Sequence, residues 1–247
     1  MQDVYFTYVL AAVWGGSLLA YLVSGASARS ERVEGIGGTM LLGKGVMNWT
    51  YWMTEPVVRS MVALGVTANS LTWASLVLGV GAGVALATGW FGLACLLAVC
   101  STIGDILDGQ VARHSHTGSN RGELLDAAVD RYTELAFLGG MIIYFRDSVP
   151  LILLGLAALQ ACMMVSYATA KAEALGVTPP RGLMRRHERS TYLIVGAGLS
   201  PLIGEHLTNV WPQLPPTSPA IAGLVVVATI GNYAAVRRLV QIGQALR

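Results

Sequence analysis

Residues 91–108 have the sequence FGLACLLAVCSTIGDILD, and this stretch decides the fold. It is apolar over most of its length and ends in two carboxylates, Asp105 and Asp108. A helix that crosses the hydrocarbon core of a membrane needs about 20 mainly apolar residues, because its backbone must satisfy its own hydrogen bonds there. The stretch therefore predicts a membrane-spanning helix with a polar site at one end.

The composition of the whole chain agrees with this interpretation. Hydrophobic residues make up 54% of the 247 residues and charged residues 12%, whereas a soluble domain carries about 25% charged residues. These proportions exclude a disordered chain, a disulfide-bonded secreted scaffold and a cytosolic enzyme with a polar surface. The net charge of +2 gives no reason to expect a nucleic acid as partner.

We expect an all-α, polytopic membrane bundle. Outward from residues 91–108, apolar runs of similar length recur along the chain and predict seven spans. The predicted spans are Val4–Ser24, Leu71–Thr88, Phe91–Asp108, Gly122–Tyr144, Pro150–Ala172, Ser190–Ile203 and Ala220–Ala235.

The segment between the first two spans has a different character. Gly45–Gly65 mixes Trp and Met residues with Asn48, Glu55 and Arg59. This mixture favours a helix that lies in the cytoplasmic membrane interface. The alternative is an ordinary linker whose aromatic residues lie at the membrane surface.

Positive charges predict the orientation, because cytoplasmic loops of membrane proteins carry an excess of Lys and Arg. With seven spans, 14 of the 16 Lys and Arg residues fall on one side of the membrane. They are Arg29, Arg32, Lys44, Arg59, Arg113, Arg121, Lys171, Arg181, Arg185, Arg186, Arg189, Arg237, Arg238 and Arg247. We therefore expect the N-terminus outside, the C-terminus inside and the polar site facing the cytoplasm.

Four of the six aspartates, Asp105, Asp108, Asp126 and Asp130, fall within 26 residues at the inner ends of two adjacent spans. Their spacings of three and four residues place each pair on one face of its helix. Ionisable groups in membrane helices are costly, so four together need compensation. Ordinary polar residues at helix ends would explain one or two of them, but not this spacing.

A divalent cation would compensate these carboxylates. A set of oxygen ligands favours Mg²⁺ or Mn²⁺ over zinc. Gly109 and Gly122 leave room for a bulky ligand on the same faces, and Arg113 is placed to hold a phosphate. A metal, an arginine and a carboxylate that can take a proton together favour phosphoryl transfer.

Residues 105–113, DILDGQVAR, and residues 122–130, GELLDAAVD, carry a resemblance to a known family. They resemble the signature of the CDP-alcohol phosphotransferases, D-x2-D-G-x2-A-R-x8-G-x3-D-x3-D, at all eight fixed positions. The resemblance extends over about Gly65–Leu239, with Ala68 where the family often has proline. It implies three segments: an extra N-terminal span (1–28), a linker with the interfacial helix (29–64) and a six-span transferase domain (65–247).

The resemblance also implies a reaction and a set of roles. Such enzymes transfer a phospho-alcohol group from a CDP-linked lipid, here CDP-diacylglycerol, to the hydroxyl of a polar acceptor and release CMP. It implies that Asp105, Asp108 and Asp126 hold two metal ions, and that Asp130 joins them or acts as the general base. It implies a homodimer and a bacterial or archaeal cytoplasmic membrane. The residues implied at the CDP site are Gly109, Ala112, Arg113, Gly122, Asn69 and Thr67.

The basic loop after the fifth predicted span bears on the acceptor. Residues 172–176, AEALG, and 182–189, GLMRRHER, resemble bacterial phosphatidylinositol-phosphate synthases. The resemblance implies that Lys171, Arg186 and Arg189 bind the phosphate of inositol phosphate, although Thr169 stands where that subfamily has a second basic residue. Inositol, glycerol phosphate and serine remain alternative acceptors. The loop could also serve orientation alone or bind anionic lipid headgroups.

Two other classes of protein compete with a transferase. An ion-coupled transporter would also carry acids inside the membrane, but near its midplane and often on broken helices. A purely structural membrane protein gives no reason for the spacing of the aspartates. We therefore expect a membrane transferase.

Overall fold

The computed structural model of the protein describes residues 3–24, 43–178 and 182–246. Within these ranges the chain forms eight α-helices and no strand. The helices are α1 (Val4–Val23), α3 (Lys44–Ala63), α4 (Ala68–Ala87), α5 (Phe91–His114), α6 (Asn120–Tyr144), α7 (Val149–Ala174), α8 (Arg186–Val210) and α9 (Ser218–Ala245). All seven predicted spans lie in helices, and the predicted interfacial helix is α3, which confirms the all-helical expectation.

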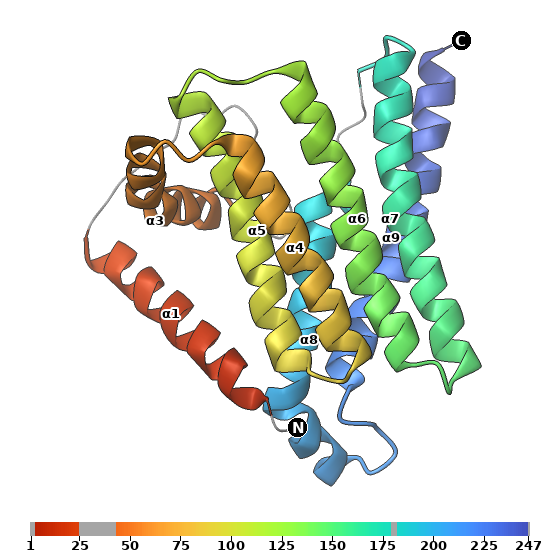
Figure 1. Ribbon diagram of the computed structural model, residues 1–247. Helices are drawn as coiled ribbons and strands as arrows, with labels where there is room; N and C mark the ends of the chain where they lie inside the picture. Colours follow the sequence, from red (N-terminus) through yellow and green to blue (C-terminus); the bar gives the residue numbers. More distant parts are fainter. Residues whose placement is uncertain (1–2, 25–42, 179–181, 247) are drawn as a thin grey trace.

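Helices α4 to α9 form a bundle, with α1 and α3 at its side (Figure 1). Helix α4 packs against both α5 and α6, while α9 packs against α7 and α8. Helix α5 ends and α6 begins at the same end of the bundle, where α3 also lies (Figure 1). We call this the aspartate end, because the four aspartates of the signature are near it.

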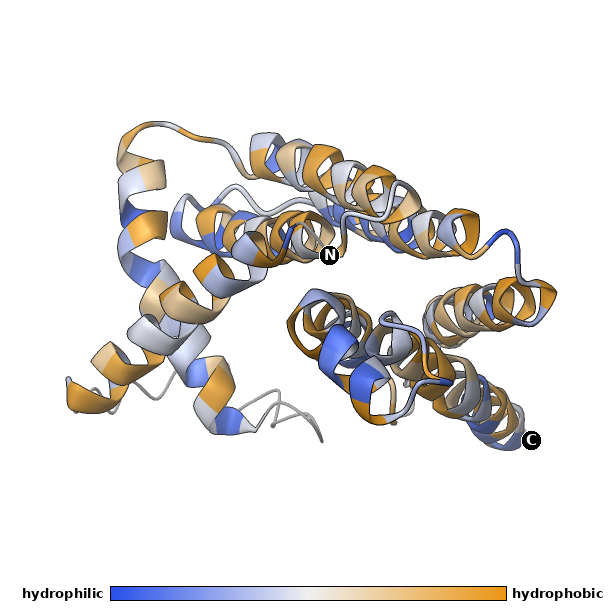
Figure 2. Cartoon of the chain, turned by 90° about the horizontal axis from the view of Figure 1, so that it is seen from below, coloured by the Kyte–Doolittle hydropathy of each residue, from blue (hydrophilic) through white to orange (hydrophobic). Residues whose placement is uncertain are grey.

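Five of the described helices, α1, α4, α5, α7 and α9, are long and apolar enough to cross a membrane by themselves. Helices α6 and α8 have similar lengths but contain more charged residues. Figure 2 shows that hydrophobic residues cover most of the helices, while hydrophilic residues are confined to short stretches. In α6 and α8 several of the charges are buried inside the bundle, so hydropathy alone understates the fit of these two helices to a membrane.

The start of α8 differs from the expectation. We predicted that Arg186 and Arg189 lie in a loop, with the span beginning at Ser190. This boundary was wrong, because α8 already begins at Arg186. The Glu188 carboxylate accepts a hydrogen bond from the backbone N–H of Arg185 at 3.1 Å, which satisfies a donor at the helix start. Both arginines therefore have fixed directions on a helix.

Glycines allow α4 and α6 to approach each other closely. A Cβ added at Gly83 would lie 2.2 Å from the backbone oxygen of Ala136, and one added at Gly140 would lie 2.1 Å from that of Gly83. Such contacts are possible only without a side chain, as is common where membrane helices pack. The close packing holds α6, and the aspartates it carries, against α4.

We predict that Gly83→Ala destabilises the protein in spite of the higher helix propensity of alanine, because the added methyl group has no space. The expected loss is roughly 1–3 kcal/mol, the usual cost of overpacking, and would be measured as a lower midpoint of thermal unfolding in detergent. Gly81→Ala is the matched control, since its Cβ would lie 3.4 Å from Leu97 Cδ1. Equal midpoints for the two variants would contradict this account of the packing.

Candidate active site

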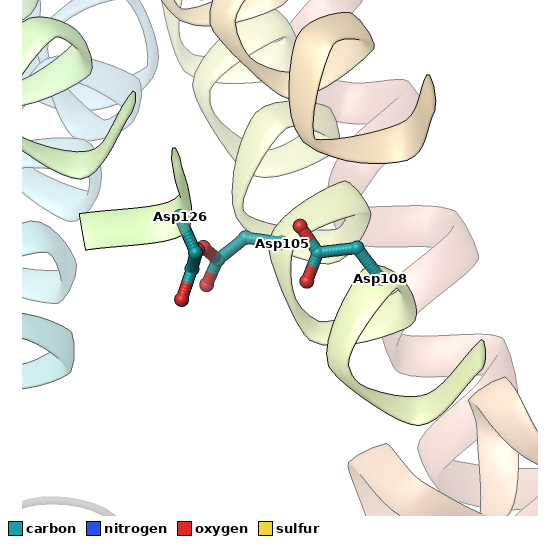
Figure 3. A group of neighbouring side chains, drawn as sticks. All are labelled: Asp105, Asp108 and Asp126. Carbon is teal, nitrogen blue, oxygen red and sulfur yellow. The ribbon is translucent and has the colours of Figure 1, made fainter. Parts of the chain in front are cut away.

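Helices α5 and α6 bring three carboxylates together. The connection between the helices is short, residues 115–119, and Ser119 caps α6 by accepting a hydrogen bond from the backbone N–H of Gly122 at 3.2 Å. Asp105 and Asp108 on α5 then face Asp126 on α6 (Figure 3). One oxygen from each of the three lies within 4.8 Å of the others. The spacing in the sequence predicted this convergence, and the structure brings these three residues together.

Asp108 has a neighbour that the sequence did not indicate. The hydroxyl of Thr72, on α4, donates a hydrogen bond to Asp108 Oδ2 at 2.6 Å, and both residues are buried. The bond fixes the rotation of the carboxylate and occupies one of its oxygens. Thr72 and Ser75 are two polar residues near the start of a mainly apolar span, and nothing else in the sequence indicated the contact.

Arg186 lies between the fourth aspartate and the other three. Its Nη1 donates to Asp105 Oδ2 at 2.8 Å, and its Nη2 forms an ion pair with Asp130 Oδ1. The guanidinium therefore joins α5, α6 and α8 at one point. Asp130 lies beside the three-carboxylate group and is connected to it through Arg186.

The donor set fits a divalent cation. Asp105, Asp108 and Asp126 converge on a partly buried space, with Asp130 beside them. Arg186 pairs with Asp105 and Asp130, and Arg131 Nη2 lies 3.7 Å from Asp130 Oδ2, so Asp108 and Asp126 have no ion pair among the described residues. Asp126 Oδ1 is buried and has no hydrogen-bond partner among the described residues. A buried oxygen without a donor is costly, and coordination to a cation would satisfy it.

A second group of charges lies one helical turn further along α6. Glu134 accepts from Arg189 Nη2 at 2.7 Å and forms an ion pair with Arg131 Nη1 at 3.0 Å. Arg189 is only 1% exposed and also donates to the backbone oxygen of Met184 at 2.7 Å. Arg131 donates in turn to the Ser166 hydroxyl on α7. This network fixes α8 relative to α6 and α7.

The residues predicted to contact CDP lie near the aspartates. A Cβ added at Gly109 would lie 3.2 Å from Arg113 Nη1, so the glycine makes room for that guanidinium. A Cβ added at Gly122 would lie 3.7 Å from Asn69 Oδ1, which places Asn69 beside the start of α6. Ala112 precedes Arg113 on the same helix. Thr67 caps α4 by accepting from the backbone N–H of Ser70 at 3.2 Å, so it has at least a structural role.

A further buried cation lies beyond the predicted set. Arg238, on α9, donates to Thr169 Oγ1 at 3.1 Å and to the backbone oxygen of Leu183 at 3.1 Å. Lys171, which we predicted at the acceptor site, is exposed in the last turn of α7, two residues beyond Thr169. The sequence marked Arg238 only as one more positive charge at the C-terminus, because nothing in it pairs α7 with α9.

A cavity opens between α4, α5, α6 and α8. Its lining includes two charged residues, Arg186 and Glu134, and the apolar residues Phe137, Leu193 and Ile194. Ser101, Thr102 and Thr133 add hydroxyl groups to its wall. The cavity is connected to the aspartates through Arg186, which pairs with Asp105 and Asp130.

The model of the CDP-alcohol phosphatidyltransferase family matches residues 65–230, which include all four aspartates and Arg186. The chain belongs to this family. A CDP-alcohol phosphatidyltransferase is an integral membrane transferase, so the prediction of an enzyme is confirmed over that of a transporter.

Individual relatives agree with this assignment. The phosphatidylinositol phosphate synthase of Corynebacterium glutamicum is 37% identical over 153 residues, which cover 60% of this chain and 70% of that protein. A crystal structure of Mycobacterium tuberculosis phosphatidylinositol phosphate synthase with CDP-DAG bound has a TM-score of 0.67 and 25% identity, covering 76% of this chain and 92% of that one. A second structure of that enzyme, in complex with manganese and citrate, has the same TM-score. The match covers 76% of this chain and 88% of that one.

These relatives confirm the predicted resemblance to the bacterial phosphatidylinositol-phosphate synthases. They also agree with the expected divalent cation, since one of the relatives was solved with manganese and the present chain brings three carboxylates together. The role of each site residue stays a prediction.

We predict that Glu134→Gln destabilises this phosphatidyltransferase by roughly 3–5 kcal/mol, because it leaves the buried Arg189 without a carboxylate. Unfolding in detergent would measure the loss. Glu123→Gln, at an exposed position in the first turn of the same helix, is the control and is expected to change stability little.

A paired replacement tests the same explanation. In Glu134→Leu/Arg189→Met both charges are removed, so much of the stability should return. A double variant as unstable as Glu134→Gln would show that the ion pair is not the cause.

Proposed function

We propose that the chain transfers the phosphatidyl group of CDP-diacylglycerol to a hydroxyl of inositol phosphate and releases CMP. The observation that carries the proposal is the group of three facing carboxylates on α5 and α6, with Arg186 between Asp105 and Asp130. The names of the relatives support the choice of acceptor, and the CDP-DAG bound to one of them supports the choice of donor.

Asp105, Asp108 and Asp126 would hold Mg²⁺ or Mn²⁺, with Asp130 at the edge of the site. Two such ions, if bound there, would neutralise negative charge on the phosphate oxygens of the CDP-linked donor, including those of the phosphoryl group under attack. Thr72 keeps Asp108 oriented, and Arg186 keeps Asp105 and Asp130 at a fixed separation. These contacts preorganise the carboxylates, so little rearrangement is needed when the substrates arrive.

The donor would lie with its nucleotide near the turn between α5 and α6. Arg113 would contact the phosphates, while Gly109, Ala112 and Gly122 leave space for the nucleotide and Asn69 offers a hydrogen-bonding amide. Thr67 would take part mainly by fixing the start of α4.

The acceptor would approach from the side of α7, α8 and α9. Arg186, Arg189 and Lys171 are the cations predicted for its phosphate, and Arg238 adds a fourth one at the contact of α7 with α9. Arg189 is held by Glu134 and Met184, so it would contribute as a fixed charge. Inositol, glycerol phosphate and serine are the acceptors to test against inositol phosphate.

In the transfer itself, Asp130 would take the proton of the attacking hydroxyl. The hydroxyl oxygen forms a bond to the phosphorus that carries the diacylglycerol group. The bond from this phosphorus to the bridging oxygen breaks, and CMP leaves with that oxygen. Arg186 is in contact with Asp130 and would stabilise the carboxylate before it accepts the proton.

The site also suggests an orientation. The acceptor and CMP are water-soluble, so the aspartate end would face the cytoplasm of a bacterial or archaeal cell, with the N-terminus outside. With the seven predicted spans, 14 of the 16 Lys and Arg residues fall on the side of the aspartates, which supports a cytoplasmic face there. We further propose that the protein is a homodimer, as the family resemblance implies.

The first test is release of CMP from CDP-diacylglycerol by the purified protein. We expect release only with Mg²⁺ or Mn²⁺ and an acceptor, and fastest with inositol phosphate among the four acceptors. Asp126→Asn should reduce turnover at least a hundredfold, whereas Asp147→Asn, at an exposed position in the turn after α6, should leave it unchanged. Lack of CMP release with every acceptor would remove the proposal.

Asp130→Asn tests the base. The amide cannot take the proton, so turnover per folded molecule should fall by about 10²–10⁴. The variant also loses the ion pair with Arg186, so thermal unfolding is measured alongside and the rate is corrected for the folded fraction. An active Asp130→Asn enzyme would overturn this role.

Arg238→Gln tests the acceptor pocket. Loss of one charge-assisted contact should raise the KM for inositol phosphate by roughly tenfold and leave the KM for CDP-diacylglycerol unchanged. Arg237→Gln removes the same charge at the neighbouring exposed position and is the control. An unchanged acceptor KM in Arg238→Gln would exclude Arg238 from the pocket.

A further inference from the structure

The first two described helices, α1 and α3, lie before the segment that matches the family. We propose that they form a brace that positions the aspartate end of α5 for the metal and the CDP-linked donor. The inference rests on the proposed function for the identity of the two substrates. It gives the N-terminal helix a role in the reaction, although α1 does not touch the aspartates of the signature.

One end of the brace is at the start of α5. The Asp3 carboxylate accepts hydrogen bonds from the backbone N–H groups of Gly92 at 2.5 Å and Leu93 at 3.2 Å. These are free donors at a helix start, where a carboxylate is also favoured by the helix dipole. Trp90, the residue that precedes α5, gives no side-chain cap, so Asp3, the residue that precedes α1, supplies this cap.

The backbones of Asp3 and Gly92 lie very close together at this end of the brace. A Cβ added at Gly92 would lie 2.2 Å from the backbone oxygen of Asp3, so only glycine allows the contact. Asp3 is itself buried. The start of α1 is therefore fixed to the start of α5, at the end of the bundle away from the aspartates (Figure 1).

The other end of the brace is a pair of aromatic contacts between α1 and α3. The rings of Trp14 and Trp49 meet edge to face with their centroids 5.1 Å apart, and those of Tyr21 and Trp52 lie 5.5 Å apart. Trp49 is buried in this contact. Edge-to-face packing of large rings is favourable and directional, so α1 holds α3 in one position.

Helix α3 in turn packs on the last turns of α5. Thr54 and Gln110 are buried and hydrogen-bonded to each other, with Gln110 Nε2 donating to Thr54 Oγ1 at 2.8 Å. Val58 packs beside them in a cluster with Leu107 and Val111. Gln110 follows Asp108 and Gly109 within the signature segment, so α3 contacts the turn of α5 that carries the metal ligand.

The helices that the brace contacts predict which substrate binds less tightly when the brace is lost. Helix α3 acts on α5, which carries two of the metal ligands and Arg113. The cations proposed for the acceptor lie on α7, α8 and α9. Loss of the brace should therefore weaken binding of the metal and the donor more than that of the acceptor, since Arg186 is the one of its four described cations that contacts α5.

The test uses the full-length protein with Trp49→Ala/Trp52→Ala, which frees α1 from α3. We expect the KM for CDP-diacylglycerol and the half-saturating Mn²⁺ concentration to rise about threefold or more, as for other remote residues coupled to a site. The KM for inositol phosphate should rise clearly less than either of these, because Arg186 is the one acceptor cation that contacts α5. A variant that only loses stability would show a smaller active fraction, hence a lower apparent kcat, with all three constants unchanged, and this result would overturn the brace.

Two further variants control the test. Tyr5→Ala/Tyr8→Ala removes two aromatic side chains of α1 that are 73% and 57% exposed, and it should leave the three constants unchanged. Trp49→Phe/Trp52→Phe keeps a ring at each position and should restore most of the wild-type values. If the control double variant shifts the constants as much as the tryptophan variant, the aromatic contacts are not the cause.

Binding of Mn²⁺ measured by electron paramagnetic resonance separates this inference from the proposed function. Trp49→Ala/Trp52→Ala should bind Mn²⁺ about threefold or more weakly than the wild type, without any turnover being needed. If the wild type releases no CMP but the Mn²⁺ affinities differ in this way, the proposed function fails and the brace stands. If CMP is released and the variant's Mn²⁺ affinity and kinetic constants are unchanged, the brace fails and the function stands.

Discussion

The contact on which the rest of the structure depends is the ion pairing of Arg186 with Asp105 and Asp130. Charges inside a membrane bundle are tolerated only when other charges or hydrogen bonds compensate them. Arg186 compensates one carboxylate on α5 and one on α6, and it comes from α8. One side chain thereby fixes α8 to α5 and α6, which lie far from it in the sequence, at the point where the reaction would occur.

The second ion-pair group repeats the arrangement one turn away. Glu134 follows Asp130 by four residues on α6, and Arg189 follows Arg186 by three on α8, so the two helices face each other through successive charged pairs. Such a pair adds little net stability compared with apolar packing, but it permits only one register between the helices. Close packing of α4 against α6 at Gly83 and Gly140 supports the same register from the other side.

Outside the catalytic bundle, the same principle of satisfying buried polar groups connects the N-terminal helices to the site. Asp3 satisfies the free N–H groups at one end of α5, and Thr54 satisfies the buried amide of Gln110 near the other end. Helix α5 is thus held at both ends by residues that lie before the family-matched segment. Asp105 and Asp108, the two aspartates that α5 contributes to the carboxylate group, lie in the part of the helix between these contacts.

The sequence by itself determined the membrane class, the helices and the convergence of Asp105, Asp108 and Asp126, because these follow from local properties. A hydrophobic run of sufficient length must be helical in a membrane, and a spacing of three or four residues places side chains on one helix face. Only the tertiary structure decided which group pairs with each charge. These contacts join residues that are 36 to 89 positions apart in the sequence: Arg186 with Asp105, Arg238 with Thr169, Thr72 with Asp108 and Asp3 with Gly92. Such pairings depend on how the helices pack against one another. The pattern of residues within a single helix does not contain this information.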